Sequence, residues 1–295
     1  MATTVLLLGI VPFGPVTQVV VLCQCLVAPR DGYALLIIRD TFYLSRISLL
    51  PSTNAAFFRE QGYLHISGVL SEQRVDEIRS AAKTLTAELP PRHDGSVRLD
   101  QVVSMSCEVD TLATSRTLLT HLAALIGENI ELIENRHNHL TTSRSGSQGR
   151  LHRDIVQWTR NMVTVIAYLT DCLDLGVATQ VVPGSHWWPC LGKLNNGGTW
   201  MDAVSPYSDL VGQALPVPTR AGDVLVMDGM LYHAAGGAGT GERTVVCLAY
   251  RSVDELAAGA SAPHCRLVAG ARIYRGSIAC NVKRPAEEAT QKRTS

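Results

Sequence analysis

Short runs of strand-forming residues, separated by glycine, proline and polar turns, fill the chain between Glu131 and Tyr250. β-Branched residues are frequent in these runs, and each run has the length of one strand. No regular alternation with helices accompanies them, so the pattern favours antiparallel strands over a parallel α/β sheet. The runs read IELIENRHNHL, MVTVIAYLT, ATQVVPG, GDVLVMDG and RTVVCLAYR.

Helical patterns come before these strands. The stretch STNAAFFREQGYLHISGVL, which starts at Ser52, predicts a short polar helix followed by a strand. Ser71 is expected to cap a helix over EQRVDEIRSAAKTLTAEL, which Pro90 and Pro91 then end. TSRTLLTHLAALIG predicts a further helix. Helices first and antiparallel strands after predict an α+β domain with a β-sandwich or barrel core of the jelly-roll type.

The first part of the chain differs from the rest. Residues 2–29 carry no charged side chain, which is typical of a signal peptide or membrane anchor. There is no basic segment before them, however, and prolines and glutamines divide them into short apolar pieces. We therefore expect residues 1–51 to be an apolar extension outside the membrane, residues 52–281 to form one domain, and residues 282–295 to be a polar tail.

Composition narrows the class of partner and compartment. The 26 basic and 26 acidic residues balance, so the chain lacks the excess positive charge with which proteins neutralise nucleic-acid phosphates. Its eight cysteines are dispersed without a CxxC pair, which favours reduced thiols and a cytoplasmic location. We expect a small-molecule substrate, with no nucleic acid or membrane as partner. A homodimer is an open alternative.

The segment LHRDIVQW places His152 and Asp154 two residues apart, which allows three interpretations. The pair could bind a metal, form a surface ion pair, or belong to a kinase catalytic loop. A kinase loop requires asparagine five residues after the aspartate, but Thr159 stands there. At a strand end, residues two apart point to the same face and offer an imidazole and a carboxylate to one ion.

A metal site of this kind needs a third ligand from elsewhere in the chain. His233, at the end of GDVLVMDGMLYH, is the best candidate. Two histidines and one carboxylate with open positions are typical of non-haem Fe(II) oxygenases. Such enzymes commonly use 2-oxoglutarate, whose far carboxylate suits an arginine. Arg243 follows His233 by ten residues, and a turn through AAGGAGTGE would bring its strand back beside the ligand.

From about Thr53 to Arg251 the chain resembles the phytanoyl-CoA dioxygenase-like family of Fe(II)/2-oxoglutarate oxygenases, in particular its fungal natural-product members. The segments that carry the resemblance are FFREQGYLHISGVLSEQRVDEI, LHRD, GVATQVVPGSHWWP, AGDVLVMDGMLYHAAGG and ERTVVCLAYRS.

The resemblance implies a double-stranded β-helix, which is a cupin-like jelly roll, with flanking helices. It also implies that His152, Asp154 and His233 bind Fe(II), and that Arg243 and Thr179 hold the cosubstrate 2-oxoglutarate. Two segments depart from the family pattern. Gly149 replaces a glutamine that often precedes the first ligand by three residues, and the closing segment GARIYRGSIACNV matches loosely.

Other polar residues near the motifs have simpler interpretations. His137 and His139 are expected to share a strand face, but with no carboxylate nearby they predict pocket or backbone contacts rather than a rival metal pair. His186, in PGSH, is expected to stabilise a turn. Trp187, Trp188 and Trp200 could equally be core or pocket residues, whereas Tyr232 and Tyr250, which flank the motifs, are expected to line the pocket.

The resulting hypothesis is an Fe(II)- and 2-oxoglutarate-dependent dioxygenase. It would use O2 to oxidise an unactivated C–H bond of a small, fairly apolar terpenoid or alkaloid intermediate, with release of succinate and CO2. Two alternatives stay open: a non-catalytic partner subunit that keeps the fold, and a cupin-type dioxygenase that uses no 2-oxoglutarate. The second alternative would leave Arg243 without a role.

Overall fold

A computed structural model describes residues 3–13, 17–27, 29–30, 33–34, 37–39, 51–143, 149–155, 162–188, 213–236, 242–253 and 264–271. The chain divides into two compact units, residues 1–49 and residues 50–295. Each unit is described by itself.

The first unit is made of antiparallel strand pairs. Strands β1 (Thr3–Phe13) and β2 (Thr17–Val27) form a hairpin in which Thr3 is opposite Val27 and Phe13 is opposite Thr17. β5 (Ile37–Arg39) extends this sheet beside β2, while β3 (Pro29–Arg30) pairs with β4 (Tyr33–Ala34). The uncharged stretch of the sequence is therefore a hairpin here. Within the described part of the chain, no helix has both the length and the apolar character needed to cross a membrane.

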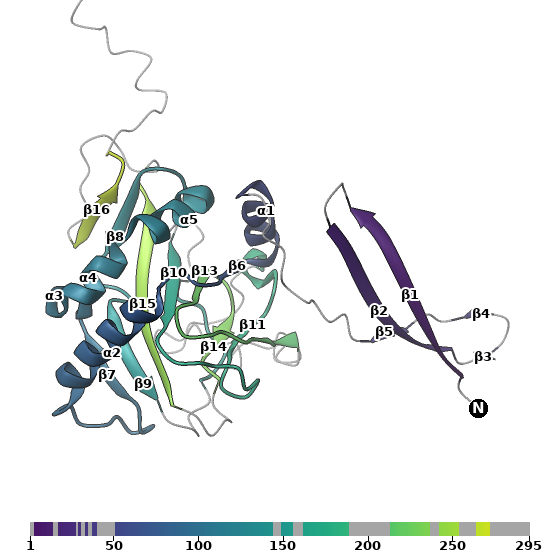
Figure 1. Ribbon diagram of the computed structural model, residues 1–295, viewed down its shortest axis with the longest axis horizontal. Coiled ribbons are helices and arrows are strands. Elements are labelled where there is room, and N and C mark those ends of the chain that lie inside the picture. Colours follow the sequence, from purple (N-terminus) through teal and green to yellow (C-terminus); the bar gives the residue numbers. More distant parts are fainter. Residues whose placement is uncertain are drawn as a thin grey trace, which may run out of the picture. The chain divides into compact units, whose positions relative to one another are not determined.

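An eight-stranded sheet is the centre of the second unit (Figure 1). Its antiparallel strands run in the order β16, β8, β15, β10, β13, β6, and β9 pairs with both β15 and β7. A separate three-stranded antiparallel sheet has the order β12, β11, β14. The large sheet contains β6 (Tyr63–Ile66), β7 (Val97–Asp100), β8 (Ile130–Ile133), β9 (His139–Ser143), β10 (Val163–Tyr168), β13 (Val224–Asp228), β15 (Arg243–Ser252) and β16 (Cys265–Ala269), and the small sheet contains β11 (Thr179–Val181), β12 (Leu215–Val217) and β14 (His233–Ala234).

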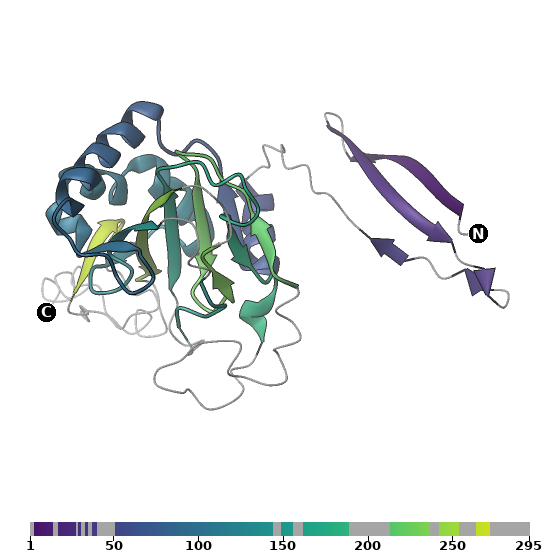
Figure 2. The same cartoon turned by 90° about the horizontal axis from the view of Figure 1, so that it is seen from below.

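The two faces of the large sheet pack against different layers. On β10, Val163 and Val165 join an apolar cluster with the helices, which gather on one side of the sheet (Figure 2). Ile166 and Tyr168 instead join a cluster with Val181 of the small sheet. Successive strand residues point to opposite faces, so this alternation places Tyr168 in the layer between the two sheets. Three layers result: helices, large sheet and small sheet.

Local sequence signals account for the helices. Ser71 caps α2 as expected, because its hydroxyl accepts a hydrogen bond from the Arg74 amide at 3.3 Å. α2 ends at Thr86, ahead of Pro90, and Ser115 caps α5 in the same manner as Ser71. The helices are α1 (Pro51–Gln61), α2 (Glu72–Thr86), α3 (Val102–Met105), α4 (Cys107–Ala113) and α5 (Arg116–Ile126), with a short 3-10 helix η1 (Ser185–Trp187).

One expected strand is in fact two. The run IELIENRHNHL contains β8, then a turn, then the start of β9. His137 lies in that turn with φ of 50°, in the left-handed region, whereas His139 opens β9. The prediction that these two histidines share a strand face is therefore wrong. The chain has to turn here because β8 and β9 pair with different parts of β15.

Candidate functional site

Three side chains from two distant segments meet at one point. Ligand atoms of His152, Asp154 and His233 all lie within 4.8 Å of one another. The Asp154 Oδ1 atom is 3.8 Å from Nε2 of His152 and 3.6 Å from Nε2 of His233. The predicted trio is thus brought together, with two imidazole nitrogens and one carboxylate oxygen directed at a common space.

Backbone pairing holds the two segments in register. The main chains of His152 and His233 exchange two hydrogen bonds, each 2.9 Å long, in an isolated antiparallel bridge. The amide of Asp154 donates to the carbonyl of Gly229, also at 2.9 Å. The sequence predicted that the H-x-D segment is the end of a regular strand. The structure shows instead a single bridge beside β14. The bridge, not strand alternation alone, determines where the ligands meet.

Both histidines present the same nitrogen. The Nδ1 atom of His152 bonds the Arg150 carbonyl, and that of His233 bonds the Leu231 carbonyl, each at 2.9 Å. A carbonyl accepts but cannot donate, so each Nδ1 carries a proton, and in a neutral imidazole with that proton the lone pair is on Nε2. Nε2 is therefore the candidate metal-binding nitrogen of each histidine.

The carboxylate of Asp154 is buried and surrounded by nitrogen. Burial by itself raises its pKa, but the nearby His233, His137 and His152 outweigh burial and hold that pKa below its usual value. The hydroxyl of Thr164 on β10 donates to Oδ2, which leaves Oδ1 toward the histidines. Burial, together with the nearby His233, lowers the pKa of His152 to about 4. At neutral pH the Asp154 carboxylate is thus an anion and the His152 imidazole is neutral, and these are the forms in which the two groups bind a divalent ion.

A second polar group surrounds Arg243, the first residue of β15. Its Nη2 donates to the Thr179 hydroxyl at 3.1 Å, and the Tyr168 hydroxyl lies 2.6 Å from the same oxygen. The side chain is buried, and its Nε has no hydrogen-bond partner among the described residues. A buried guanidinium with an unused donor is suited to bind a carboxylate.

The route from His233 to Arg243 differs from the expectation. β14 pairs with β11 in the small sheet, whereas β15 pairs with β10, β9 and β8 in the large sheet. The chain between β14 and β15 therefore connects one sheet to the other, and these two strands do not pair as a hairpin. Arg243 approaches the site through Thr179 of β11, because the two sheets face each other there.

Arg153, between the two ligands, points away from them and is buried. Its Nη2 donates to the carbonyls of Ser185 at 2.6 Å and Trp188 at 2.8 Å, and its guanidinium lies 4.2 Å from the centre of the Tyr232 ring. The Ser185 hydroxyl in turn accepts from the Tyr232 amide at 2.9 Å. These contacts connect the H-x-D segment, the 3-10 turn and the residue before His233.

The PGSH turn is structural, as its pattern suggested. His186 is buried and its Nε2 contacts the Arg59 carbonyl at 2.9 Å. Trp187 is 71% exposed and binds the same carbonyl, whereas Trp188 is half-buried against Tyr232. Contrary to the prediction from its place in the sequence, Tyr250 does not line a pocket but belongs to the core under the helices, where its hydroxyl donates to the Ala113 carbonyl at 2.9 Å. Trp200 lies outside the described residues.

Gly149, the departure from the family pattern, has a steric cause. A Cβ atom there would lie 2.8 Å from the Ala235 amide nitrogen, closer than real Cβ contacts allow. The Gly149 amide also donates to the Ala235 carbonyl at 2.9 Å. This position approaches the opposite backbone too closely for any side chain.

Sequence reasoning missed several residues of the site. Thr164 and Tyr168 lie on one face of β10, and their spacing of four in MVTVIAYLT was the available signal. His137 has a carboxylate partner after all, because its Nε2 is 3.2 Å from Asp154 Oδ1. No local pattern indicates that contact, since it joins segments 17 residues apart in sequence.

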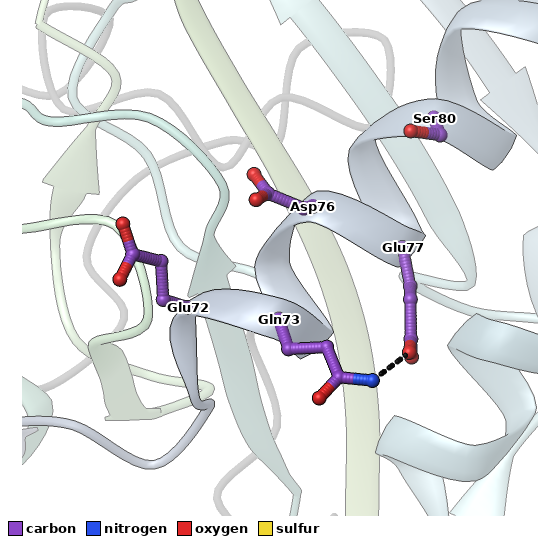
Figure 3. A pocket seen from close by; sticks show the side chains of 5 residues that line it. All are labelled: Glu72, Gln73, Asp76, Glu77 and Ser80. Carbon is purple, nitrogen blue, oxygen red and sulfur yellow. Dashed lines mark hydrogen bonds between the residues drawn. The ribbon is translucent and has the colours of Figure 1, made fainter.

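A hollow on the outer surface of α2 is a different feature (Figure 3). It is lined by Glu72, Gln73, Asp76, Glu77 and Ser80, and Gln73 donates to Glu77 at 2.9 Å. None of the residues of the metal trio or around Arg243 contributes to it. An acidic, open helix face with internal hydrogen bonds is typical of a solvated surface.

Fold and site define a mixed helix and strand protein with a two-histidine, one-carboxylate centre between two sheets. Comparison with known proteins gives the family: residues 58–245 match phytanoyl-CoA dioxygenase (PhyH). The chain belongs to this family, and with it to the non-haem iron, 2-oxoglutarate-dependent dioxygenases.

Curated fungal proteins are similar to the chain. The dioxygenase af480 of Aspergillus fumigatus is 26% identical over 224 residues, which cover 68% of this chain and 66% of that protein. The multifunctional dioxygenase prhA of Penicillium brasilianum is 23% identical over 217 residues, or 65% of this chain and 70% of that protein. The match thus spans about two thirds of either relative.

Solved structures share the fold. The epimerase SnoN, in complex with Fe3+, alpha ketoglutarate and nogalamycin RO, has a TM-score of 0.60 and 20% identity, over 75% of this chain and 96% of that one. HygX from Streptomyces hygroscopicus, with nickel and 2-oxoglutarate bound, has a TM-score of 0.57 and 20% identity, over 69% of this chain and 88% of that one.

Proposed function

We propose that the chain is an Fe(II)- and 2-oxoglutarate-dependent dioxygenase that oxidises an unactivated C–H bond of a small, fairly apolar natural product. The observation that carries the proposal is the presence of two complementary polar groups in one layer. Thr164 contacts the candidate metal ligand Asp154, and Tyr168 contacts the Arg243–Thr179 pair. Both side chains project from one face of β10, about 13 Å apart along the strand.

Each residue has a distinct task in this proposal. His152, Asp154 and His233 hold iron through two Nε2 atoms and Oδ1, while Thr164 restrains the other carboxylate oxygen. Arg243 and Thr179 bind the far carboxylate of 2-oxoglutarate, and Tyr168 orients the Thr179 hydroxyl. When bound, iron and 2-oxoglutarate supply the oxidising chemistry with O2, and succinate and CO2 are released. The residues of the chain bind and orient iron, 2-oxoglutarate and the substrate, and they exclude water from the site.

The fold in this proposal is a double-stranded β-helix of the jelly-roll type. Two antiparallel sheets with an apolar cluster between them support it, and so do the related folds of solved enzymes. Ile155, which follows Asp154, belongs to a buried apolar cluster with Met162 and Met230. The fungal dioxygenases similar to the chain support a natural product, on the basis of association.

The proposed setting is the cytoplasm, with O2 and a small molecule as partners. The balanced charge supports this choice over nucleic acid. Free thiols at Cys107, Cys172, Cys247 and Cys265 support a reducing compartment.

Anaerobic addition of Fe(II) and then 2-oxoglutarate tests the proposal. We expect a visible metal-to-ligand charge-transfer band with the wild type, and about thirtyfold weaker 2-oxoglutarate binding in Arg243→Ala, because a buried charge pair contributes about 2 kcal/mol or more. Arg79→Ala is the control, since Arg79 is exposed and forms an i,i+3 pair with the exposed Asp76.

The outcomes separate the alternatives. If iron binds but no band forms with 2-oxoglutarate, the chain is a cupin-type dioxygenase without this cosubstrate. If the band forms but no succinate is released with O2 across a panel of terpenoid and alkaloid substrates, the chain is a non-catalytic member. A band with unchanged 2-oxoglutarate affinity in Arg243→Ala would remove the role given to Arg243.

A further inference from the structure

The turn between β8 and β9 brings His137 against the candidate metal ligand. Its Nε2 lies 3.2 Å from Asp154 Oδ1, closer than Nε2 of either His152 or His233. The same oxygen therefore faces three imidazoles. Motif spacing predicts two of them, and the third comes from a segment that no motif includes.

The structure holds this turn in place from both sides. Arg136 donates to the main-chain oxygen of Asp154, so consecutive residues contact the backbone and the carboxylate of one aspartate. Asn138, on the other side, accepts from the Val103 amide at 2.9 Å and donates to the Glu134 carbonyl at 2.9 Å. Three successive side chains thus fix the turn.

His137 adopts a backbone conformation that costs energy. Its φ of 50° is in the left-handed region, which few non-glycine residues other than asparagine, aspartate and histidine adopt. Such conformations persist where the surroundings enforce them, frequently at functional sites. Here the conformation directs the imidazole toward Asp154.

The geometry around the Asp154 carboxylate indicates the role of His137. Thr164 occupies Oδ2, so Oδ1 is the oxygen available to a metal. A carboxylate oxygen has two lone pairs, one for a metal and one for an N–H donor. Among the described residues, the set whose ligand atoms lie within 4.8 Å of one another contains His152, Asp154 and His233 without His137. That places His137 beside the carboxylate rather than among the ligands.

We propose that His137 is a positioning residue, which donates a hydrogen bond from Nε2 to Asp154 Oδ1 and, with Thr164, fixes the rotation of the carboxylate for metal binding. The inference rests on the proposed function, because it assumes that Asp154 is a ligand. Hydrogen-bond partners of metal ligands commonly change metal affinity by about tenfold or more.

Titration of the full chain with Co(II), followed by calorimetry and by the visible d–d bands, tests the proposal. His137→Asn keeps a residue that tolerates the left-handed conformation but is too short to reach Oδ1. We expect about tenfold weaker Co(II) binding in this variant. His137→Gln, whose amide nitrogen can replace Nε2, is expected to restore affinity to within about threefold of the wild type.

His264→Asn is the matched control. His264 has a φ of 67° and an exposed side chain, so it shares the left-handed backbone but not the contact with Asp154. Its substitution should leave Co(II) affinity and spectrum unchanged. If Co(II) affinity fell as much in this control as in His137→Asn, the proposal would be overturned, because a change in the backbone would then explain both losses.

Two further outcomes would overturn the positioning role of His137. Equal Co(II) affinity in the wild type and His137→Asn overturns the positioning role. Electron paramagnetic resonance of the Cu(II)-loaded chain counts bound nitrogens: loss of one nitrogen on His137→Asn would make His137 a ligand and overturn the role as stated. Absence of Co(II) binding in the wild type would instead contradict the metal centre itself, which is a separate failure.

Discussion

Asp154 illustrates how much one buried residue depends on its neighbours. Taken alone, a carboxylate in the protein interior would be driven toward its neutral form, because burial penalises charge. Three imidazoles and the Thr164 hydroxyl reverse that tendency. The sequence predicted Asp154 and its two proposed ligand partners, whereas the contacts of Asp154 with Thr164 and His137 could be seen only in the tertiary structure.

His139 allows a test of acid stability at the residue scale. The side chain is buried, and burial lowers its pKa from 6.5 to about 3. The unfolded chain therefore binds a proton below about pH 6.5 that the folded chain does not, so stability falls as pH falls from about 6.5 toward 3. Between pH 6.5 and 5 this one residue should lower the free energy of unfolding by about 2 kcal/mol.

Urea unfolding of the wild type and His139→Gln at pH 7 and pH 5 measures this effect. The variant should lose about 2 kcal/mol less than the wild type between the two values. His264→Gln, at an exposed position, should keep the acid dependence of the wild type. The same loss in all three proteins would show that His139 does not carry the effect.

At the scale of elements, the site depends on a connection that no single element supplies. β14 has two residues and the H-x-D segment forms only a bridge, so neither is stable by itself. Arg153 joins both to the turn at η1 through two carbonyls and the Tyr232 ring. A buried arginine with these contacts is a structural connection between the two segments that carry the candidate metal ligands.

Arg153→Met should therefore weaken both stability and metal binding. The substitution removes the hydrogen bonds to two carbonyl groups, each costing about 1 kcal/mol or more, so we expect a loss of about 2 to 4 kcal/mol in the free energy of unfolding. Thermal melts and Co(II) titration measure the two effects. Arg79→Met, on the exposed face of α2, should change neither. Unchanged Co(II) affinity in Arg153→Met would show that the ligand segments hold their register without this connection.

For the whole molecule, the division into two units has a direct consequence. All five predicted site residues lie in the unit of residues 50–295, and that unit has its own apolar core. Removal of residues 1–49 should therefore leave Co(II) affinity within about twofold of the full chain, since the ligands and their partners are retained. Calorimetry on both proteins, with circular dichroism to compare folding, checks this expectation. A tenfold loss of affinity in the shorter chain would mean that the first unit supports the site.

The sequence was sufficient where chemistry or local pattern carries the information. Strand runs, the Ser71 cap and the H-x-D, His233 and Arg243 spacing are local or compositional signals, and the family match over residues 58–245 confirms the family they indicated. The tertiary structure decided which of these elements meet. It separated β14 from β15, divided the run around His137 into two strands, and placed Thr164, Tyr168 and His137 at the site. The physical reason is that side-chain contacts across a sheet depend on non-local pairing and register, which the periodicity of a single strand does not contain.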